Sequence, residues 1–467
     1  MQIVKWKART SLEKAGLKIV RLLNKHKFQA FFVGGIVRNF LLKRESDNLD
    51  IATDALPDEV EKVLESAGIE FKQVGKKYGT ILAIAHGQKI EITTFRAEGR
   101  YSDQRHPDSV KFIVDYINDA KRRDLTINAL YLNPVTCEIF DPEGGLHDLG
   151  RKIIKFVGDP KKRIEEDPLR MLRAVRFVVT LGFKFEKNSF AAIKTRAKLI
   201  RDVSGTRIRL ELDKILLSQN ARIGLELLDA AGLLKCITPE LIELKRIDHK
   251  SSRHHREGNM FVHTMLALEN SAPDLLVRYA VLFHDIGKAS VKMRQKSDRG
   301  GFPYLSTPGH EKASVKIFLR FAQKYSFSRA DQEIVGWLIL HHDDRTNFCQ
   351  LSGEKQIKYA LEPRFARLLD VWFADSRGNL RLNDLGTVVP GNSPAVAIGE
   401  KFLRRIAIKS ELLNKFARGE FIITETGLRT GIKIGQILDE VKIKIILGQI
   451  TDKTSAINFL KKFKKNT

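Results

Sequence analysis

Three polar residues in the first hundred positions have the types and spacing of a divalent-metal site. Asn48 and Asp50 lie two apart in the segment NLDIAT, and Glu91 lies in the alternating segment KIEITTF. Side chains two apart on a strand share one face, so Asn48 and Asp50 would face the same metal. With an acid from a neighbouring strand, they suit two divalent ions that activate a hydroxyl group and neutralise a leaving pyrophosphate. A solvated strand face with scattered acids is the alternative.

A glycine pair comes shortly before these acids. Gly34 and Gly35 lie between a predicted strand and a predicted helix, and Arg38 follows them. Glycines let backbone amides approach phosphate groups, and the first turn of a helix adds the positive end of a dipole. Taken alone, a glycine pair after a strand more often marks an ordinary turn.

A second chemical set lies in the C-terminal half of the chain. It has the order His…His-Asp…Asp and consists of His263, His284, Asp285 and Asp375. Imidazoles and carboxylates on packed helices suit a divalent transition metal or Mg2+, which activates water for attack on a phosphoester. Three other histidines, His310, His341 and His342, are candidates for the same pocket. Each of them alone is more simply explained as a surface residue or a hydrogen-bonded core residue.

Further segments follow the acidic strand in a fixed order. They are KRRDLTINA at 121–129, DPEGGLHDL at 141–149, EDPLRMLRAVRF at 166–177 and SGTRIRLEL at 204–212. Together with GGIVRN at 34–39 and NLD at 48–50, they resemble the successive motifs of the bacterial tRNA CCA-adding enzyme and poly(A) polymerase family, within the nucleotidyltransferase superfamily. The resemblance covers roughly residues 28–217, and chance agreement of so many ordered segments is negligible.

The resemblance implies a role for each matching residue. Asp50, with Asn48 and Glu91, would form the catalytic Mg2+ site. Nucleotide binding would involve Gly34, Gly35, Arg38, Arg123, Asp124, Asn128, Asp167, Arg170, Arg173 and Arg176. Asp167 and Arg170 lie three apart on a helix predicted over 163–181, where they would offer an acceptor and a donor to a base edge and so select C or A without a template. Without the family, the same pair is predicted to form a salt bridge.

Two positions depart from the family pattern. The first aspartate of the DxD motif is Asn48 here, and the aspartate that ends GGxVRD is Asn39. Asparagine offers a metal only a neutral carbonyl oxygen, so the site has one negative charge fewer. Asp47 faces the other way on a regular strand, so only a bulge or a register shift would let it replace Asn48. The N-terminal part that carries these motifs, called the head below, is then a weakened enzyme, an enzyme that uses Asp47, or a module that binds tRNA without extending it.

A loop between the acidic strand and the KRRDLTINA segment indicates which nucleotides the enzyme would add. Segment 100–110, RYSDQRHPDSV, resembles the flexible loop of CCA-adding and A-adding enzymes and favours addition of CCA to the 3′ end of tRNA from CTP and ATP. A-only addition and polyadenylation are the alternatives.

The histidine-aspartate set, preceded by EGNMFVHT at 257–264, resembles the HD phosphohydrolase superfamily. This resemblance implies hydrolysis of phosphomonoesters or 2′,3′-cyclic phosphates with Mg2+, Mn2+, Ni2+ or Fe2+. If the head only binds tRNA, this hydrolase is the main activity.

Composition agrees with a nucleic-acid partner. The 467 residues include 81 Lys and Arg against 56 Asp and Glu, a net charge of +25 that favours a polyanion such as tRNA. The three cysteines form no CxxC pair, so neither a disulfide framework nor a thiolate zinc site is indicated, and a cytoplasmic location fits. No apolar run approaches the ~18 residues of a membrane helix, and we expect no membrane partner. The oligomeric state is not indicated.

The elements that must position these residues change near residue 160. Before it, a helix at 11–24, a strand at 28–33 and a hairpin of 80–85 with 89–95 predict a small α+β unit, whereas helical periodicity dominates afterwards. We therefore predict a multidomain α+β protein. It would have a small mixed-sheet nucleotidyltransferase head at 1–158, an all-α neck and body at 159–248, an α-helical HD domain at 249–395 and a basic tail at 396–467. The lysine-rich end of the tail is predicted to be disordered or to bind phosphate.

Overall fold

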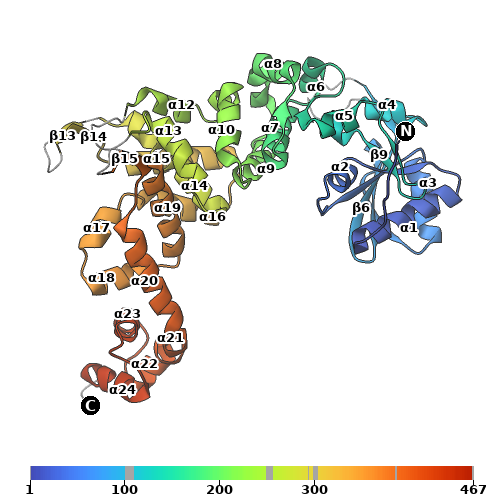
Figure 1. Ribbon diagram of the computed structural model, residues 1–467. Coiled ribbons are helices and arrows are strands. Elements are labelled where there is room, and N and C mark those ends of the chain that lie inside the picture. The colour runs from blue at the N-terminus through green and yellow to red at the C-terminus, as the bar shows by residue number, and fades with distance from the viewer. Residues whose placement is uncertain are drawn as a thin grey trace. The chain divides into compact units, whose positions relative to one another are not determined.

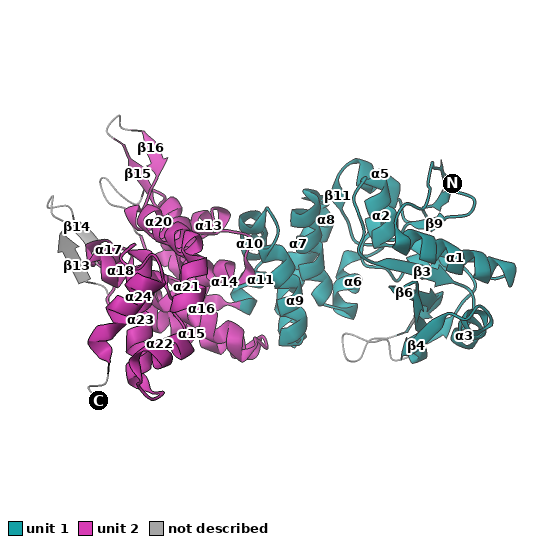
Figure 2. Ribbon diagram, turned by 90° about the horizontal axis from the view of Figure 1, so that it is seen from below, with its two compact units in different colours: residues 1–237 teal, residues 238–467 magenta. Residues whose placement is uncertain are grey.

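The computed structural model describes residues 2–99, 110–248, 256–292, 294–297, 303–383 and 387–464. The chain forms two compact units, Met1–Ile237 and Thr238–Thr467, which Figure 2 draws in different colours. Residues 100–109, which make up nearly all of the predicted flexible loop, lie outside the described residues. The finer domain boundaries after residues 158, 248 and 395 stay predictions.

The first unit begins with a mixed sheet in the order β1-β10-β9-β2-β3-β6-β5-β4. The strands are β1 (Gln2–Ile3), β2 (Ala30–Val33), β3 (Leu49–Thr53), β4 (Glu70–Gly75), β5 (Thr80–Ala85), β6 (Gln88–Thr94), β9 (Tyr131–Asn133) and β10 (Glu138–Phe140). Within this sheet β3 and β6 pair in parallel, while the other neighbouring strands pair antiparallel. The predicted hairpin of β5 and β6 is confirmed.

Helices α1 (Ser11–Lys25) and α3 (Pro57–Ser66) pack against this sheet (Figure 1). The apolar stripe of α1, which includes Leu12, Ile19 and Leu23, is buried because its spacing keeps these side chains on one face of the helix. A second core cluster on the sheet gathers Phe31 and Phe95. Short elements complete the head: α2 (Gly35–Leu41), β7 (Arg96–Glu98), β8 (Val110–Phe112), α4 (Tyr116–Ala120), α5 (Gly145–Gly150) and β11 (Ile153–Ile154).

The rest of the first unit is almost entirely helical, as predicted. Its elements are α6 (Pro160–Glu166), α7 (Leu169–Leu181), β12 (Lys184–Phe185), α8 (Lys187–Arg196), α9 (Gly205–Leu216), α10 (Ala221–Ala230) and α11 (Leu233–Ile237). The prediction of one continuous helix over 163–181 is wrong. The chain leaves the helical conformation at Asp167, which has φ −148° and ψ 100°, because the ring of Pro168 disfavours a helical residue before it.

The second unit is built from helices packed around aromatic and aliphatic side chains. Its first elements are α12 (Pro239–Glu243), α13 (Met260–Glu269), α14 (Leu275–Phe283), α15 (His310–Lys324), α16 (Arg329–Leu340), α17 (Arg345–Gln350), α18 (Gly353–Ala360) and α19 (Phe365–Gly378), with hairpins β13–β14 (Arg294–Ser297, Pro303–Ser306) and β15–β16 (Leu380–Leu382, Val388–Pro390). Helix α13 packs along α19, and α16 packs against α14 and α15. These contacts bring together the segments that carry the histidine-aspartate set.

The basic tail is folded. Helix α20 (Pro394–Ile408) leads into α21 (Ser410–Phe416), α22 (Gly419–Thr426), α23 (Ile432–Ile446) and α24 (Lys453–Leu460). The last four helices enclose an apolar cluster that includes Ile422, Ile437 and Val441. The prediction of disorder is wrong as far as Lys464, and Lys465 lies outside the described residues.

Among the described residues, every helix is too short or too polar to cross a lipid bilayer.

Candidate active sites

A cavity of about 750 Å³ in the first unit collects every residue of the predicted head site. Its walls come from the turn after β2, from β3 and β6, from segment 122–128 and from the start of α7. The predicted site residues that line it are Gly34, Gly35, Arg38, Asn48, Asp50, Glu91, Arg123, Asp124, Asn128, Asp167, Arg170, Arg173 and Arg176. Their roles in catalysis and binding stay predictions, but they share one space.

Two carboxylates lie side by side in this cavity. The parallel register of β3 and β6 places Asp50 beside Glu91, and Asn48 comes just before β3. Burial, together with repulsion from Glu91, raises the pKa of Asp50 to about 6. A site that holds two carboxylates this close favours a bound cation. Asp47 is exposed and is not among the described residues that line the cavity, and β3 pairs with β6 in unbroken register from Leu49 onward.

The turn after β2 keeps the floor of the cavity open. Gly34 has φ 70° and ψ −124°, a conformation that residues with a side chain rarely adopt. A Cβ atom at this position would lie 3.7 Å from Arg123 Nη1 and 3.9 Å from Asp50 Oδ2. Glycine is therefore needed here because of its backbone conformation. Its lack of a side chain also leaves the space between the carboxylates and Arg123 free for a ligand.

Hydrogen bonds fix two arginines at the centre of the cavity wall. Arg38 Nη1 donates to Asn128 Oδ1 at 2.5 Å, and Asn128 Nδ2 donates to Asp124 Oδ1 at 3.1 Å. Asp124 also accepts from Arg173 Nη2 at 2.6 Å. Burial, together with the nearby Arg176 charge, lowers the pKa of Arg38 to about 10, so this guanidinium remains charged at neutral pH.

Two buried residues, Tyr131 and Asp119, fix the Arg123 guanidinium by accepting hydrogen bonds from it. Its Nε donates to the Tyr131 hydroxyl at 3.0 Å and its Nη2 donates to Asp119 at 3.2 Å. Burial alone would raise the pKa of Asp119, but the charges of Arg122 and Arg123 lower it to about 2. Asp119 therefore stays ionised and orients Arg123 toward the carboxylates.

Asn39 occupies the second position that departs from the family pattern, and it lies away from the acids. Its Oδ1 accepts from Arg38 Nη2 at 2.9 Å, while its Nδ2 donates to the Glu45 carbonyl at 3.1 Å. An aspartate would keep the first contact but could not donate the second. Asn39 therefore supports Arg38 and the following loop, and the loss of charge that concerns a metal is at Asn48.

The pair expected to read the base is arranged differently from the prediction. Because the helix is interrupted, Asp167 and Arg170 do not share one helix, and each has its own ion pair. Asp167 Oδ2 accepts from Arg207 at 2.8 Å, and Arg170 Nη1 donates to Glu166 at 2.7 Å. Both side chains nevertheless line the cavity.

Sequence reasoning missed several residues of the cavity wall. Phe177 lies beneath two guanidiniums, those of Arg38 at 4.8 Å and Arg176 at 4.1 Å from the ring centroid. The other missed residues that line the cavity include Val74, Tyr78, Arg96 and Arg122. Phe177 and Arg122 belong to the quoted motifs, whereas the turn between β4 and β5 carries no polar motif that would have pointed to it.

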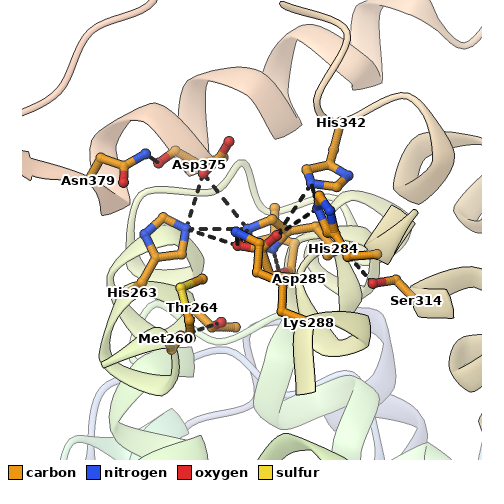
Figure 3. A network of polar contacts seen from close by, with 12 residues as sticks. Met260, His263, Thr264, His284, Asp285, Lys288, Ser314, His342, Asp375 and Asn379 are labelled. Atoms are coloured by element: carbon orange, nitrogen blue, oxygen red, sulfur yellow. Dashed lines mark hydrogen bonds and ion pairs between the residues drawn. The ribbon is translucent and has the colours of Figure 1, made fainter. Parts of the chain in front are cut away.

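In the second unit, four buried histidines have their Nε2 atoms near the Asp285 carboxylate, and Figure 3 labels three of them, His263, His284 and His342. The Nδ1 atoms of three of them lie 2.6 to 2.8 Å from a backbone carbonyl three residues earlier: His284, His310 and His342. A carbonyl oxygen only accepts, so Nδ1 carries the proton and Nε2 keeps its lone pair for a metal. In His263, Nδ1 instead faces the buried Glu257 carboxylate at 3.6 Å.

These nitrogens and two aspartates form two ligand groups. One consists of His263, His284 and Asp375, and the other of Asp285, His310 and His342; in each, the ligand atoms lie within 4.8 Å of one another. Asp285 joins them, because its Oδ2 lies 3.2 Å from His284 Nε2 and its Oδ1 lies 3.2 Å from His310 Nε2. The structure thus brings together all four predicted ligands with His310 and His342, two of the three further histidines considered for the same pocket.

The donor set fits divalent cations. Unprotonated Nε2 atoms repel each other at 3.3 Å, between His263 and His284, and at 3.2 Å, between His310 and His342, unless a positive charge lies between them. Burial would lower the pKa of His263, but Asp375 and Glu257 raise it to about 9, so this pocket attracts positive charge. His341 lies at the cavity wall and is hydrogen-bonded to Asp344 at 2.6 Å.

Two cations flank the carboxylates inside the surrounding cavity of about 630 Å³. Lys288 Nζ lies 2.8 Å from Asp285 Oδ2, and Arg345 donates to Asp375. Lysine and arginine beside a cation-binding centre are suited to the oxygens of a phosphate group. This arrangement suits the binding of a phosphate group beside a metal ion.

Three family models match the chain. Residues 30–155 match the poly A polymerase head domain, 182–244 match the probable RNA and SrmB-binding site of polymerase A, and 254–372 match the HD domain. The first match covers the head-site residues from Gly34 to Asn128, and the last covers the histidine-aspartate set except Asp375.

Curated relatives match about half of the chain. The CCA-adding enzyme of Bacillus velezensis is 41% identical over 219 residues, which are 47% of this chain and 54% of the relative. That of Bacillus pumilus is 44% identical over 200 residues, 43% of this chain and 49% of the relative. The chain thus spans about half the length of these relatives.

Solved structures match over nearly the whole chain. The Bacillus stearothermophilus CCA-adding enzyme in complex with CTP has a TM-score of 0.67 and 25% identity, over 97% of this chain and 98% of the other. The Thermotoga maritima CCA-adding enzyme complexed with tRNA-CCA has a TM-score of 0.63 and 16% identity, over 99% of each chain. The second of these likenesses is one of fold.

Proposed function

We propose that the chain is a member of the tRNA CCA-adding enzyme and poly(A) polymerase family and adds C, C and A to the 3′ end of tRNA from CTP and ATP. The observation that carries the proposal is the single cavity in which Asp50 and Glu91 face Arg38 and Arg123. The net charge of +25 supports tRNA as the partner. We place the reaction in the cytoplasm, where tRNA ends are made and repaired.

The cavity residues would have two roles, binding of the metal and binding of the triphosphate. Mg2+ held by Asp50, Glu91 and Asn48 would polarise the α-phosphate and activate the 3′-hydroxyl. Arg38 and Arg123 are oriented to bind triphosphate oxygens, since buried partners fix both guanidiniums. In the reaction, the RNA 3′-oxygen bonds to the α-phosphorus, the bond to pyrophosphate breaks, and the hydroxyl proton passes to solvent.

Incubating tRNAs that lack CCA, CA or A with Mg2+ and each labelled nucleoside triphosphate tests the proposal. Ordered addition of C, C and A is the expected result. Addition of A alone would identify an A-adding enzyme, and long A tails would identify a poly(A) polymerase. Retained tRNA binding without incorporation would make the head a tRNA-binding module.

Restoring the family's aspartate at Asn48 should accelerate addition. Asn48 lines the same cavity as Asp50 and Glu91, so Asn48→Asp returns one negative charge to the position where a cation is expected. We expect a rate increase on the order of 10²-fold, the scale of one regained electrostatic contact, and a lower Mg2+ requirement. Single-turnover rates across a Mg2+ titration measure both effects.

Asp47→Ala is the matched control, because Asp47 is exposed and lies outside the cavity lining. It should leave the rate unchanged. A large loss of activity in Asp47→Ala, with little gain from Asn48→Asp, would mean that Asp47 is the second acid and that the strand shifts in solution.

Replacing Asp167 or Arg170 should change nucleotide choice more than overall rate. Each side chain lines the cavity with one kind of hydrogen-bonding group, and each is held by a separate ion pair. We expect Asp167→Ala and Arg170→Ala to shift the ratio of C to A incorporation by about tenfold, which corresponds to roughly one hydrogen bond to a charged group. Competition between labelled CTP and ATP measures the ratio independently of the folded fraction. Arg196→Ala, on α8, is the control. If Asp167→Ala and Arg170→Ala both leave the ratio of C to A incorporation unchanged, these two residues have only a structural role.

We also propose that the second unit is a metal-dependent phosphohydrolase that acts on phosphomonoesters or 2′,3′-cyclic phosphates. The two ligand groups that share Asp285 support it, and they suit two divalent ions chosen from Mg2+, Mn2+, Ni2+ and Fe2+. Ions bound there would activate water and neutralise phosphate charge. Lys288 and Arg345 would bind phosphate oxygens beside them. If the head only binds tRNA, this hydrolysis is the chain's main reaction.

A further inference from the structure

A smaller cavity of about 320 Å³ adjoins the head cavity in the first unit. Its walls come from the hairpin of β7 and β8, from α4 with the two residues that follow it, and from α6. Arg122 lines both cavities and so forms their shared wall. The charged residues of its described lining are Lys111, Lys121, Arg122, Arg163 and Glu166. Because four of these five are cations, the charge of this cavity suits an anion.

Arginines already neutralise Glu166, the one acid of this described lining. Arg163 Nη2 donates to Glu166 Oε1, and Arg170 Nη1 donates to Glu166 Oε2 at 2.7 Å. The ammonium group of Lys111 has no acidic partner among the described side chains, and that of Lys121 donates to a neutral side-chain carbonyl at 2.8 Å. Both ammonium groups are exposed and can therefore donate to the oxygens of an anionic ligand.

A buried carboxylate fixes the walls of this cavity relative to one another. Asp119, whose side chain is fully buried, accepts from Arg122 Nε at 2.7 Å and from the Arg96 backbone amide, at the start of β7, at 3.2 Å. Arg163 Nη1 donates to the Lys121 carbonyl at 3.0 Å and so ties α6 to the same segment. Because these contacts exist before a ligand arrives, less order has to be imposed when one binds.

The position of the cavity favours a phosphate of the RNA strand over a phosphate of the incoming nucleotide. In the proposed addition reaction the triphosphate lies against Arg38 and Arg123, which line the head cavity but not the smaller one. An RNA strand whose 3′ end enters the head cavity carries a charged phosphate at each preceding linkage. Because the two cavities share Arg122, the smaller one lies next to the path of that strand.

We propose that this smaller cavity, the phosphate pocket, binds a backbone phosphate of the RNA strand shortly before the 3′ end that is extended. The inference rests on the proposed nucleotide addition. Lys111 and Lys121 would donate to the phosphate oxygens, and the fixed Arg122 would add positive charge from the shared wall. Contacts to phosphate carry no sequence information, so the pocket would hold the strand in register whichever base ends it.

Lys111→Ala tests the phosphate pocket on tRNA acceptor-stem minihelices that lack CCA and carry one uncharged methylphosphonate linkage, placed in turn at each linkage near the 3′ end. On unmodified RNA we expect the Kd to rise about tenfold, the scale of one lost hydrogen bond to a charged group. At one linkage the methylphosphonate should weaken binding to the unsubstituted protein to the same extent but cost Lys111→Ala nothing further, because the contact is already lost. The KM for CTP should stay unchanged. Filter binding and primer extension measure these quantities.

Lys62→Ala, at an exposed lysine of α3 that lines neither cavity, is the matched control and should keep the full sensitivity to that linkage. If each methylphosphonate weakens Lys111→Ala as much as the unsubstituted protein, Lys111 acts only through its general charge and the phosphate pocket is overturned. A rise in the KM for CTP at unchanged RNA affinity would assign the pocket to a nucleotide phosphate and overturn it as well. If the unsubstituted protein adds no nucleotide, the proposed addition is wrong, and the binding comparison, which needs no incorporation, still decides whether the pocket holds RNA.

Discussion

Asp50→Ala is expected to abolish nucleotide addition and to leave tRNA affinity nearly unchanged. Asp50 lies beside Glu91 in the cavity, and its substitution removes half of the carboxylate pair that would hold Mg2+. A metal contributes several kcal/mol to the stabilisation of transferring phosphate, so the rate should fall by at least about 10³-fold. Binding to tRNA comes mainly from Lys and Arg contacts with phosphates and does not need this metal. Primer extension and filter binding measure the two quantities.

Glu65→Ala is the matched control for this loss. Glu65 is an exposed acid on α3 of the same unit, so its removal changes the net charge equally but leaves the cavity intact. It should extend tRNA at the normal rate. Normal addition of CMP by Asp50→Ala would instead show that the metal site has been assigned to the wrong strand.

The head shows which parts of a site can be predicted from sequence. Strand alternation and the Gly87-Gln88 turn were sufficient for the hairpin of β5 and β6, because these signals are local. Pro168 held the signal for the break before α7, but helical spacing across 163–181 masked it. The ion pair of Asp167 with Arg207 spans forty residues, and no local pattern predicts such a contact.

In the second unit, prediction from sequence is limited by the ambiguity of single histidines. A single histidine is more often a structural residue than a ligand, and nothing near His310 or His342 in sequence marks them as ligands. They become candidate ligands only in the folded chain, where the backbone carbonyls of Thr307 and Ile339 fix Nδ1 and both Nε2 atoms lie near Asp285. In the tail, Ile434, Ile437 and Val441 repeat at helical spacing and form the buried side of α23, so this helix follows from a local pattern.

Asp285→Asn should remove phosphohydrolysis and reduce the amount of bound metal without affecting nucleotide addition. Asp285 is the residue that joins the two ligand groups, with one carboxylate oxygen near each. Asparagine keeps the shape but replaces one oxygen with a donor amide and removes the charge, so two cations can no longer share it. Loss of several kcal/mol of metal-derived stabilisation lowers hydrolysis by at least about 10³-fold. Phosphate release and metal analysis of the purified protein measure these effects.

Nucleotide addition by the same variant shows whether the first unit remains folded, because the described lining of the head cavity comes from that unit. Asp439→Ala, at a half-exposed position of α23 far in sequence from the ligand groups, should keep both activities and the full metal content. If Asp285→Asn loses both activities together, the cause is misfolding or a site shared by the two reactions. If it keeps hydrolysis with one ion fewer, one ligand group alone carries the reaction, and the ion at the other group binds without taking part.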